Sequence, residues 1–137
     1  MDYRRIVLVF VMSGLFVLFS GCSDFKIKLP NGYVLFRANA TEIYIIDPKR
    51  IVDRIIVFPH IEKYNVINTI VVGNVVSAEG EMKEYSDPGY FILETNTGKV
   101  TTGLTKDSWL LKLKELGVDS EPELKIPTIF SLNVRPT

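Results

Sequence analysis

The stretch YFILETNTGKVTTGLTKDSWLLKLKELG, residues 90–117, contains a strand, a turn, a returning strand and a helix in one continuous run. Tyr90 to Glu94 is rich in residues that favour strands. Thr95 to Gly98 has the composition of a hairpin turn, in which the glycine supplies a positive φ. Lys99 to Thr102 is therefore expected to return antiparallel, so this stretch predicts an antiparallel sheet.

The helix in this stretch carries its own start and stop signals. Thr105 can accept a hydrogen bond from the first turn, Asp107 suits the positive N-terminal end, and Gly117 follows the last turn. We expect the helix to pack on the sheet through Trp109, as part of an apolar stripe at helical spacing. The stripe consists of Trp109, Leu110, Leu113 and Leu116, with Leu111 extending it.

Several strands are predicted upstream. Tyr33 to Arg37, after the turn Pro30-Asn31-Gly32, and Thr41 to Ile46 both favour strands. Asp47-Pro48 ends the second one, because the residue before a proline is restricted. From Ile51 to Phe58, odd-numbered and even-numbered positions are both apolar, with two exceptions. This predicts a strand that is covered on both faces over most of its length.

The next region alternates with a period of two. The residues on one face of this strand would be Tyr64, Val66, Ile70 and Val72, as expected for a half-buried strand. Asn68 is polar at a position where the alternation would place an apolar residue. The region is therefore either one strand or a hairpin of two strands. Gly73-Asn74 suggests a bulge or a bend, and Ile129 to Val134 is predicted to be the last strand.

These patterns predict a mainly β fold of the α+β class, built from an antiparallel sheet or a small sandwich. One amphipathic helix lies in its C-terminal half. The chain of 137 residues has room for one such domain, which we place at 29–137.

The N-terminal residues have the layout of an export signal. Arg4 and Arg5 precede an uncharged run from Ile6 to Phe19, and small residues follow. As a helix this run spans about 21 Å, which is short of the roughly 30 Å hydrocarbon core of a bilayer. A permanent transmembrane helix is therefore the weaker interpretation.

Leu18-Phe19-Ser20-Gly21-Cys22 resembles the lipobox of bacterial lipoprotein precursors. The resemblance implies cleavage between Gly21 and Cys22, lipidation of Cys22 and a signal peptide at 1–21. Residues 22–28 then form the lipidated cysteine and a short tether. Residues 90–117 also resemble a part of small bacterial lipoproteins. The alternatives for the N-terminus are a plain secretory signal and an uncleaved anchor.

The cysteine count agrees with lipidation. Cys22 is the only cysteine, so no intramolecular disulfide can form, and attached acyl chains such as palmitate would hold the chain at a membrane. We expect a lipid-anchored protein of the cell envelope. Ser23, which is not aspartate, implies the outer membrane facing the periplasm if the host is Gram-negative and sorts lipoproteins as enteric bacteria do.

Few sequence patterns point to chemistry. The chain has one histidine, His60, and no cysteine besides Cys22, which excludes Cys/His zinc sites. Neither a P-loop nor a nucleophile elbow occurs. Without the signal peptide the chain has one more acidic than basic side chain, so nucleic acid is not an expected partner. We predict a non-enzymatic protein with no catalytic residue, metal or cofactor.

Two acidic loops are candidates for binding a protein partner. Their carboxylates are Glu79, Glu81, Glu84 and Asp87 in the first loop and Asp119, Glu121 and Glu123 in the second. They suit a basic partner that the protein would bind or neutralise, as immunity lipoproteins and periplasmic inhibitors do, although acidic surface loops also serve solubility. The alternative function is an accessory structural lipoprotein of an envelope or secretion assembly, which would expose an apolar patch or a strand edge.

Overall fold

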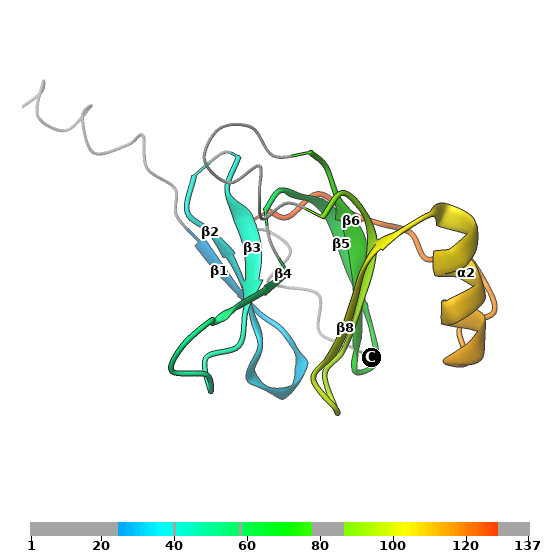
Figure 1. Cartoon of the computed structure of the whole chain (residues 1–137), viewed down its shortest axis with the longest axis horizontal. Coiled ribbons are helices and arrows are strands. Elements are labelled where there is room, and N and C mark those ends of the chain that lie inside the picture. The colour runs from blue at the N-terminus through cyan, green and yellow to red at the C-terminus, as the bar shows by residue number, and fades with distance from the viewer. Residues whose placement is uncertain (1–24, 40, 58, 78–86, 129–137) are drawn as a thin grey trace, which may run out of the picture.

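A computed structural model describes residues 25–39, 41–57, 59–77 and 87–128. In these residues, two four-stranded antiparallel sheets face each other, and a helix lies on the far side of the second sheet (Figure 1). The predicted fold class, mainly β with a helix in the C-terminal half, is confirmed, and of the two predicted arrangements the sandwich is the one formed.

The first sheet is a meander in the order β1-β2-β3-β4. Its strands are β1 (Phe25–Lys28), β2 (Val34–Arg37), β3 (Ile43–Ile46) and β4 (Ile55–Val57). The predicted Pro-Asn-Gly turn forms the short 3-10 helix η1 (Pro30–Gly32) between β1 and β2, with Asn31 at a φ of 57°. Phe25 pairs with Arg37 at one end of the sheet, and Lys28 pairs with Val34 at the other.

Strand β1 lies within the range that the sequence suggested as a tether. Phe25 and Ile27 are buried, whereas Lys26 and Lys28 are exposed. This is the period-two alternation of a strand with one face on the core, in a segment so short that the two lysines give it a polar composition. Phe25, three residues after Cys22, is therefore already part of the first sheet.

The prediction of a strand covered on both faces from Ile51 to Phe58 is wrong for its first half. Strand β4 contains only Ile55–Val57, and residues 47–54 form a loop, which we call the β3–β4 loop. Asp53 has a φ of 51°, which no strand residue adopts. The Arg54 Nε donates to the Arg50 carbonyl oxygen at 2.8 Å, which closes the loop on itself. Ile51 and Val52 are consequently exposed.

The second sheet is a meander in the order β5-β6-β7-β8. Its strands are β5 (Ile61–Ile67), β6 (Ile70–Val75), β7 (Gly89–Glu94) and β8 (Lys99–Leu104). Of the two interpretations of the Tyr64 region, the hairpin is correct, because Asn68 takes a φ of 54° in the turn between β5 and β6. Of the predicted bulge or bend at Gly73-Asn74, the bend is wrong, because β6 continues through both residues. An irregularity of the β5–β6 pairing does lie next to Asn74, but the extra residue is on β5, between Ile61 and Lys63.

The main core lies between the two sheets. It contains fully buried side chains from both of them, including Leu35, Ile45, Val57, Val71, Phe91 and Leu93. Burial of each such side chain stabilises the fold by roughly 1.5–3 kcal/mol. At one end the sheets are also joined by Asn31, whose Nδ2 donates to Thr95 Oγ1 and to Asn96 Oδ1, each at 2.9 Å.

Helix α2 (Lys106–Glu115) forms a second, smaller core on the outer face of the second sheet. Trp109 and Leu113 are buried there against Val72 and Ile92, so the predicted packing of Trp109 on the sheet is confirmed. Leu111 is 61% exposed, and its expected place in the apolar stripe is wrong. Two residues along a helix correspond to a rotation of about 200°, which turns Leu111 away from the side of Trp109.

We expect the substitution Thr105→Ala to lower the free energy of unfolding by about 1 kcal/mol. Thr105 Oγ1 accepts from the backbone N–H of Ser108 at 3.2 Å, and alanine cannot satisfy that donor. Urea unfolding followed by circular dichroism measures the loss. Thr105→Ser keeps the acceptor and is the control. Equal stability of the alanine and serine variants would contradict the cap.

Some predictions lie outside the described residues. These are the last strand, Ile129 to Val134, the lipobox residues Leu18 to Cys22, and the first-loop acids Glu79, Glu81 and Glu84. Within the described ranges, no helix has the length and apolar character needed to cross a bilayer.

Candidate functional site: an acidic groove

The described acidic residues that the sequence selected lie in two places. Asp119, Glu121 and Glu123 are exposed on the segment after α2. Asp87 lies just before β7 and accepts a hydrogen bond from Thr102 Oγ1 on β8. Of these four acids, Glu121 and Glu123 line the groove described below.

The segment with Glu121 and Glu123 is held along the edge of the second sheet. Tyr64 on β5 and Lys125 exchange two backbone hydrogen bonds, both of 2.9 Å. Asn65 Nδ2 donates to the Glu123 carbonyl oxygen at 2.7 Å. These bonds partly cover the outer edge of β5, which would otherwise present unpaired backbone groups. The groove wall is therefore fixed by backbone pairing.

The same segment is also tied to the start of α2. Lys106 Nζ lies 2.8 Å from Glu121 Oε1, and both side chains are about half exposed. The hydrogen bond from Lys106 to Glu121, together with the charge of that carboxylate, raises the pKa of Lys106 above its ordinary value. An exposed pair of this kind adds little stability, so its effect is to orient the Glu121 carboxylate.

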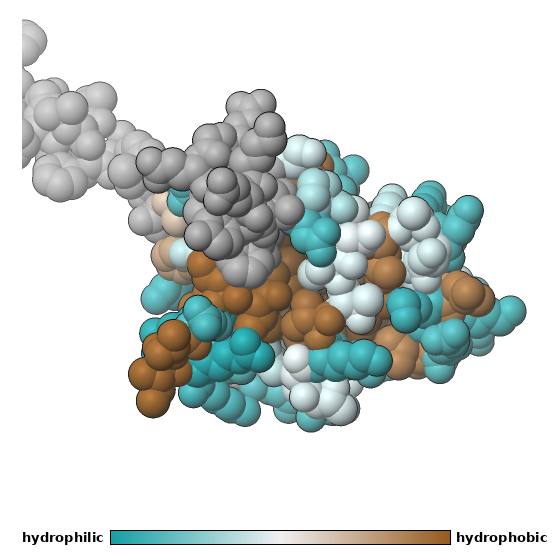
Figure 2. Space-filling model, in the orientation of Figure 1, coloured by the Kyte–Doolittle hydropathy of each residue, from teal (hydrophilic) through white to brown (hydrophobic). Residues whose placement is uncertain are grey.

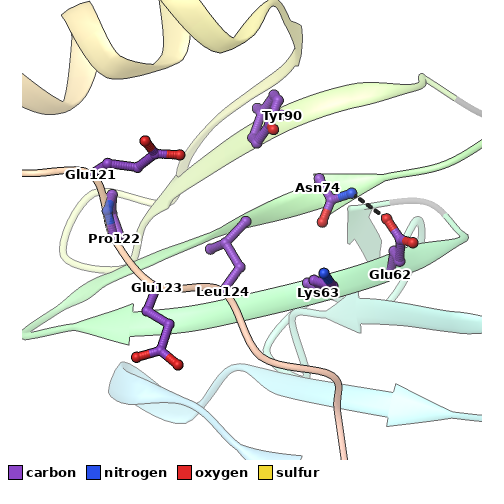
Figure 3. A pocket seen from close by; sticks show the side chains of 8 residues that line it. All are labelled: Glu62, Lys63, Asn74, Tyr90, Glu121, Pro122, Glu123 and Leu124. Carbon is purple, nitrogen blue, oxygen red and sulfur yellow. Dashed lines mark hydrogen bonds between the residues drawn. The ribbon is translucent and has the colours of Figure 1, made fainter.

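Between this segment and the outer face of the second sheet lies an open groove of about 520 Å³ (Figure 3). Asn74 on β6 and Tyr90 on β7 lie on the sheet side of the groove. Asn74 Nδ2 donates to Glu62 Oε2 at 2.6 Å, which places a third carboxylate at the groove. The full lining is Glu62, Lys63, Asn74, Tyr90, Glu121, Pro122, Glu123 and Leu124.

The groove has an excess of negative charge and of hydrogen-bond acceptors. Its lining includes three carboxylates and one ammonium group, that of Lys63. Asn74 Oδ1 is buried and has no hydrogen-bond partner among the described residues. Tyr90 stacks on Trp109 with ring centroids 4.6 Å apart, which holds an aromatic surface at the groove. Carboxylates next to an aromatic ring suit a lysine or arginine side chain.

The carboxylates do not converge on one point. Figure 3 shows Glu62, Glu121 and Glu123 pointing in different directions around the groove. In keeping with this, the described part of the chain holds no group of three or more histidine, cysteine, aspartate or glutamate residues that could bind a metal ion. The arrangement fits an extended cationic partner better than a single ion.

Sequence reasoning found part of this groove. Glu121 and Glu123 were predicted, whereas Asp119 lies outside the lining. The contribution of Glu62, Asn74 and Tyr90 was missed. The available signal was Asn68 as a turn, because a hairpin there pairs Lys63 with Asn74 and brings the neighbouring Glu62 near.

Comparison of the chain with protein-family models, with curated proteins and with solved structures found no match.

Proposed function

We propose that this protein is a membrane-anchored lipoprotein of the bacterial envelope that binds, or neutralises, a protein partner through the acidic groove. The mode of action resembles that of immunity lipoproteins and periplasmic inhibitors. The anchor is supported by the N-terminal sequence ending in Cys22. The binding role is supported by the charge and shape of the groove.

The observation that carries the proposal is the open groove, whose lining in the described residues includes three carboxylates and one lysine. A lysine or arginine of the partner that enters it can form charge-assisted hydrogen bonds, which are about twice as strong as neutral ones. Complementary charge also speeds encounter and rejects partners of the wrong sign. A groove fixed by backbone pairing loses little conformational entropy when it binds.

The anchor keeps the groove close to a membrane. Only Ser23 and Asp24 lie between Cys22 and Phe25, and the three steps from one Cα to the next over this stretch span at most about 11 Å. The partner is therefore expected to be a protein of the membrane or one that passes close to it.

Capture of partners from the native envelope by the lipidated full chain tests the groove. We expect the double variant Glu62→Gln and Glu123→Gln to retain a given partner roughly tenfold less well than the wild type, since two attractive charges are lost. The variant Glu115→Gln and Asp119→Asn is the matched control, because both residues are exposed acids outside the groove lining. Its retention should equal that of the wild type.

The salt dependence adds a second criterion. Binding through the groove should weaken steeply as ionic strength rises, because the charges are near the surface. Equal loss in the groove variant and the control, or binding that is insensitive to salt, would contradict the groove. The alternative, an accessory structural lipoprotein, would then be the better interpretation.

A further inference from the structure

The first sheet has an outer face that differs from that of the second sheet. Residues alternate along its strands, so that Leu35 and Ile45 point into the core. The outward positions are Val34, Phe36, Tyr44 and Ile46, and all four are only half-buried. In the described residues, the α-helix covers the second sheet, on the far side of the molecule (Figure 1). We call these four outward positions the outer face of the first sheet.

The outer face is aromatic and carries lysines. The rings of Phe36 and Tyr44 lie 5.4 Å apart, and Lys26 Nζ lies 5.6 Å from the centre of the Phe36 ring. Lys26 and Lys28 are exposed on the adjacent edge strand β1. Partial burial, and then the charge of Glu42, raise the pKa of the Tyr44 hydroxyl above its ordinary value, so this side chain stays neutral.

The β3–β4 loop extends this surface with the most exposed apolar side chains of the described chain. Ile51 is 93% exposed and Val52 is 72% exposed. Figure 2 shows a hydrophobic projection at the lower left, where Figure 1 has this loop, on the side of the molecule away from α2. Transfer of these two neighbouring β-branched side chains from water to an apolar environment would lower the free energy of the system.

Basic residues flank this apolar tip along the chain. Lys49, Arg50 and Arg54 are exposed in the same loop. The nearby acids are Glu42, Asp47 and Asp53, and Asp47 pairs with Arg50 at 3.6 Å. With Lys26 and Lys28 on β1 included, the charged residues in and next to the loop and the outer face are five basic and three acidic side chains.

We propose that the outer face of the first sheet and the β3–β4 loop form a contact surface for an anionic lipid bilayer. Ile51 and Val52 enter the boundary between headgroups and acyl chains. The lysines and arginines contact lipid phosphates, and the aromatic rings lie at the headgroup level. This combination of apolar tips, aromatic rings and cations is typical of interfacial membrane binding.

The position of the surface in the chain favours a bilayer over another protein. Phe25, the first residue of edge strand β1, follows the N-terminal anchor segment after a few residues, so this sheet is the part of the fold nearest to the anchor along the chain. The acidic groove lies on the outer side of the other sheet. A bilayer on the first sheet therefore leaves the groove open to the aqueous side.

This inference goes beyond the groove and requires only that the chain is held at a membrane. It does not depend on lipidation of Cys22, because the full chain with Cys22→Ser still carries the apolar run from Ile6 to Phe19. Failure of the groove to bind a partner would leave it unaffected.

A polarity-sensitive fluorophore tests the contact in the full chain with Cys22→Ser, reconstituted in vesicles. The label is attached through Val52→Cys, and Leu111→Cys, at an exposed position on α2, is the matched control. We expect the emission of the Val52 label to be about threefold higher in vesicles of phosphatidylethanolamine with about 30% phosphatidylglycerol than in phosphatidylcholine vesicles. The control label should emit equally in both.

A second variant tests whether contact with anionic lipid causes the higher emission of the Val52 label. Replacing Lys49, Arg50 and Arg54 by glutamine should abolish the rise in emission at Val52, because each basic residue near an anionic surface contributes about fivefold to its binding. Equal emission of the Val52 label in the two kinds of vesicle would overturn the proposal. A rise that grows with the protein-to-lipid ratio would also overturn it, because it would assign the surface to contact between chains.

Discussion

Replacing Trp109 by alanine is expected to lower the free energy of unfolding by about 3–5 kcal/mol. The indole is completely buried between α2 and the second sheet. Its Nε1 donates to the Phe91 carbonyl oxygen at 3.2 Å, and its ring stacks on Tyr90. Alanine leaves a cavity at the centre of this smaller core and removes the main contact that holds α2 in place. Many domains of this size have a total stability of only 5–15 kcal/mol.

Urea unfolding monitored by circular dichroism measures the effect, and Trp109→Phe is the control. Phenylalanine keeps most of the apolar contact but loses the donor to the Phe91 carbonyl oxygen, so we expect a loss of about 1–3 kcal/mol. The account of the helix packing would be refuted by a Trp109→Ala variant within about 1 kcal/mol of the wild type.

Replacing Gly73 by alanine is expected to cost about 3 kcal/mol, at the upper end of the usual range for overpacking. A Cβ at this position would clash with the Lys63 carbonyl oxygen on β5 and lie 2.6 Å from Cε1 of the Phe91 ring on β7. The carbonyl belongs to a paired strand and the ring is completely buried, so neither can move away freely. Gly73 therefore permits the close approach of three strands.

A double-mutant cycle with Phe91→Leu distinguishes this clash from a general effect of alanine. Leucine removes the ring edge, so the cost of Gly73→Ala should be smaller in the Phe91→Leu background by about 1 kcal/mol or more. The remaining cost comes from the Lys63 carbonyl oxygen. Strict additivity of the two substitutions would show that the ring does not confine position 73.

The helix was predictable because all of its determinants are local. Thr105 caps it, Asp107 lies in its first turn, and Gly117 follows it with a φ of 88°. The same holds for the hairpin between β7 and β8, where Gly98 has a φ of 76°. In both places neighbouring residues determine the backbone, and the sequence shows them directly.

The β3–β4 loop was not predictable in this way. The residues from Ile51 to Val57 favour a strand by composition, but Asp53 takes a left-handed conformation and Arg54 bonds back to Arg50. The closure of this loop depends on which residues of β3 pair with β4. Composition therefore predicted a strand that is too long, and it gave no sign that Ile51 and Val52 are exposed.

The groove was predictable only in part, because its two sides are distant in sequence. Glu121 and Glu123 stand out in a polar loop, but Glu62 joins them only when Tyr64 pairs with Lys125. No local pattern marks that bridge.

The first sheet includes residues that the sequence suggested as a tether, since a four-residue alternation at Phe25–Lys28 is too short to distinguish from a tether.

Mass spectrometry of the chain isolated from the membranes of a bacterial host tests the membrane anchor on which the proposed function rests. We predict an N-terminal peptide that begins at Cys22 and carries a diacylglycerol on its sulfur and an acyl chain on its amino group. An intact N-terminus with a free Cys22 thiol would contradict the lipoprotein anchor.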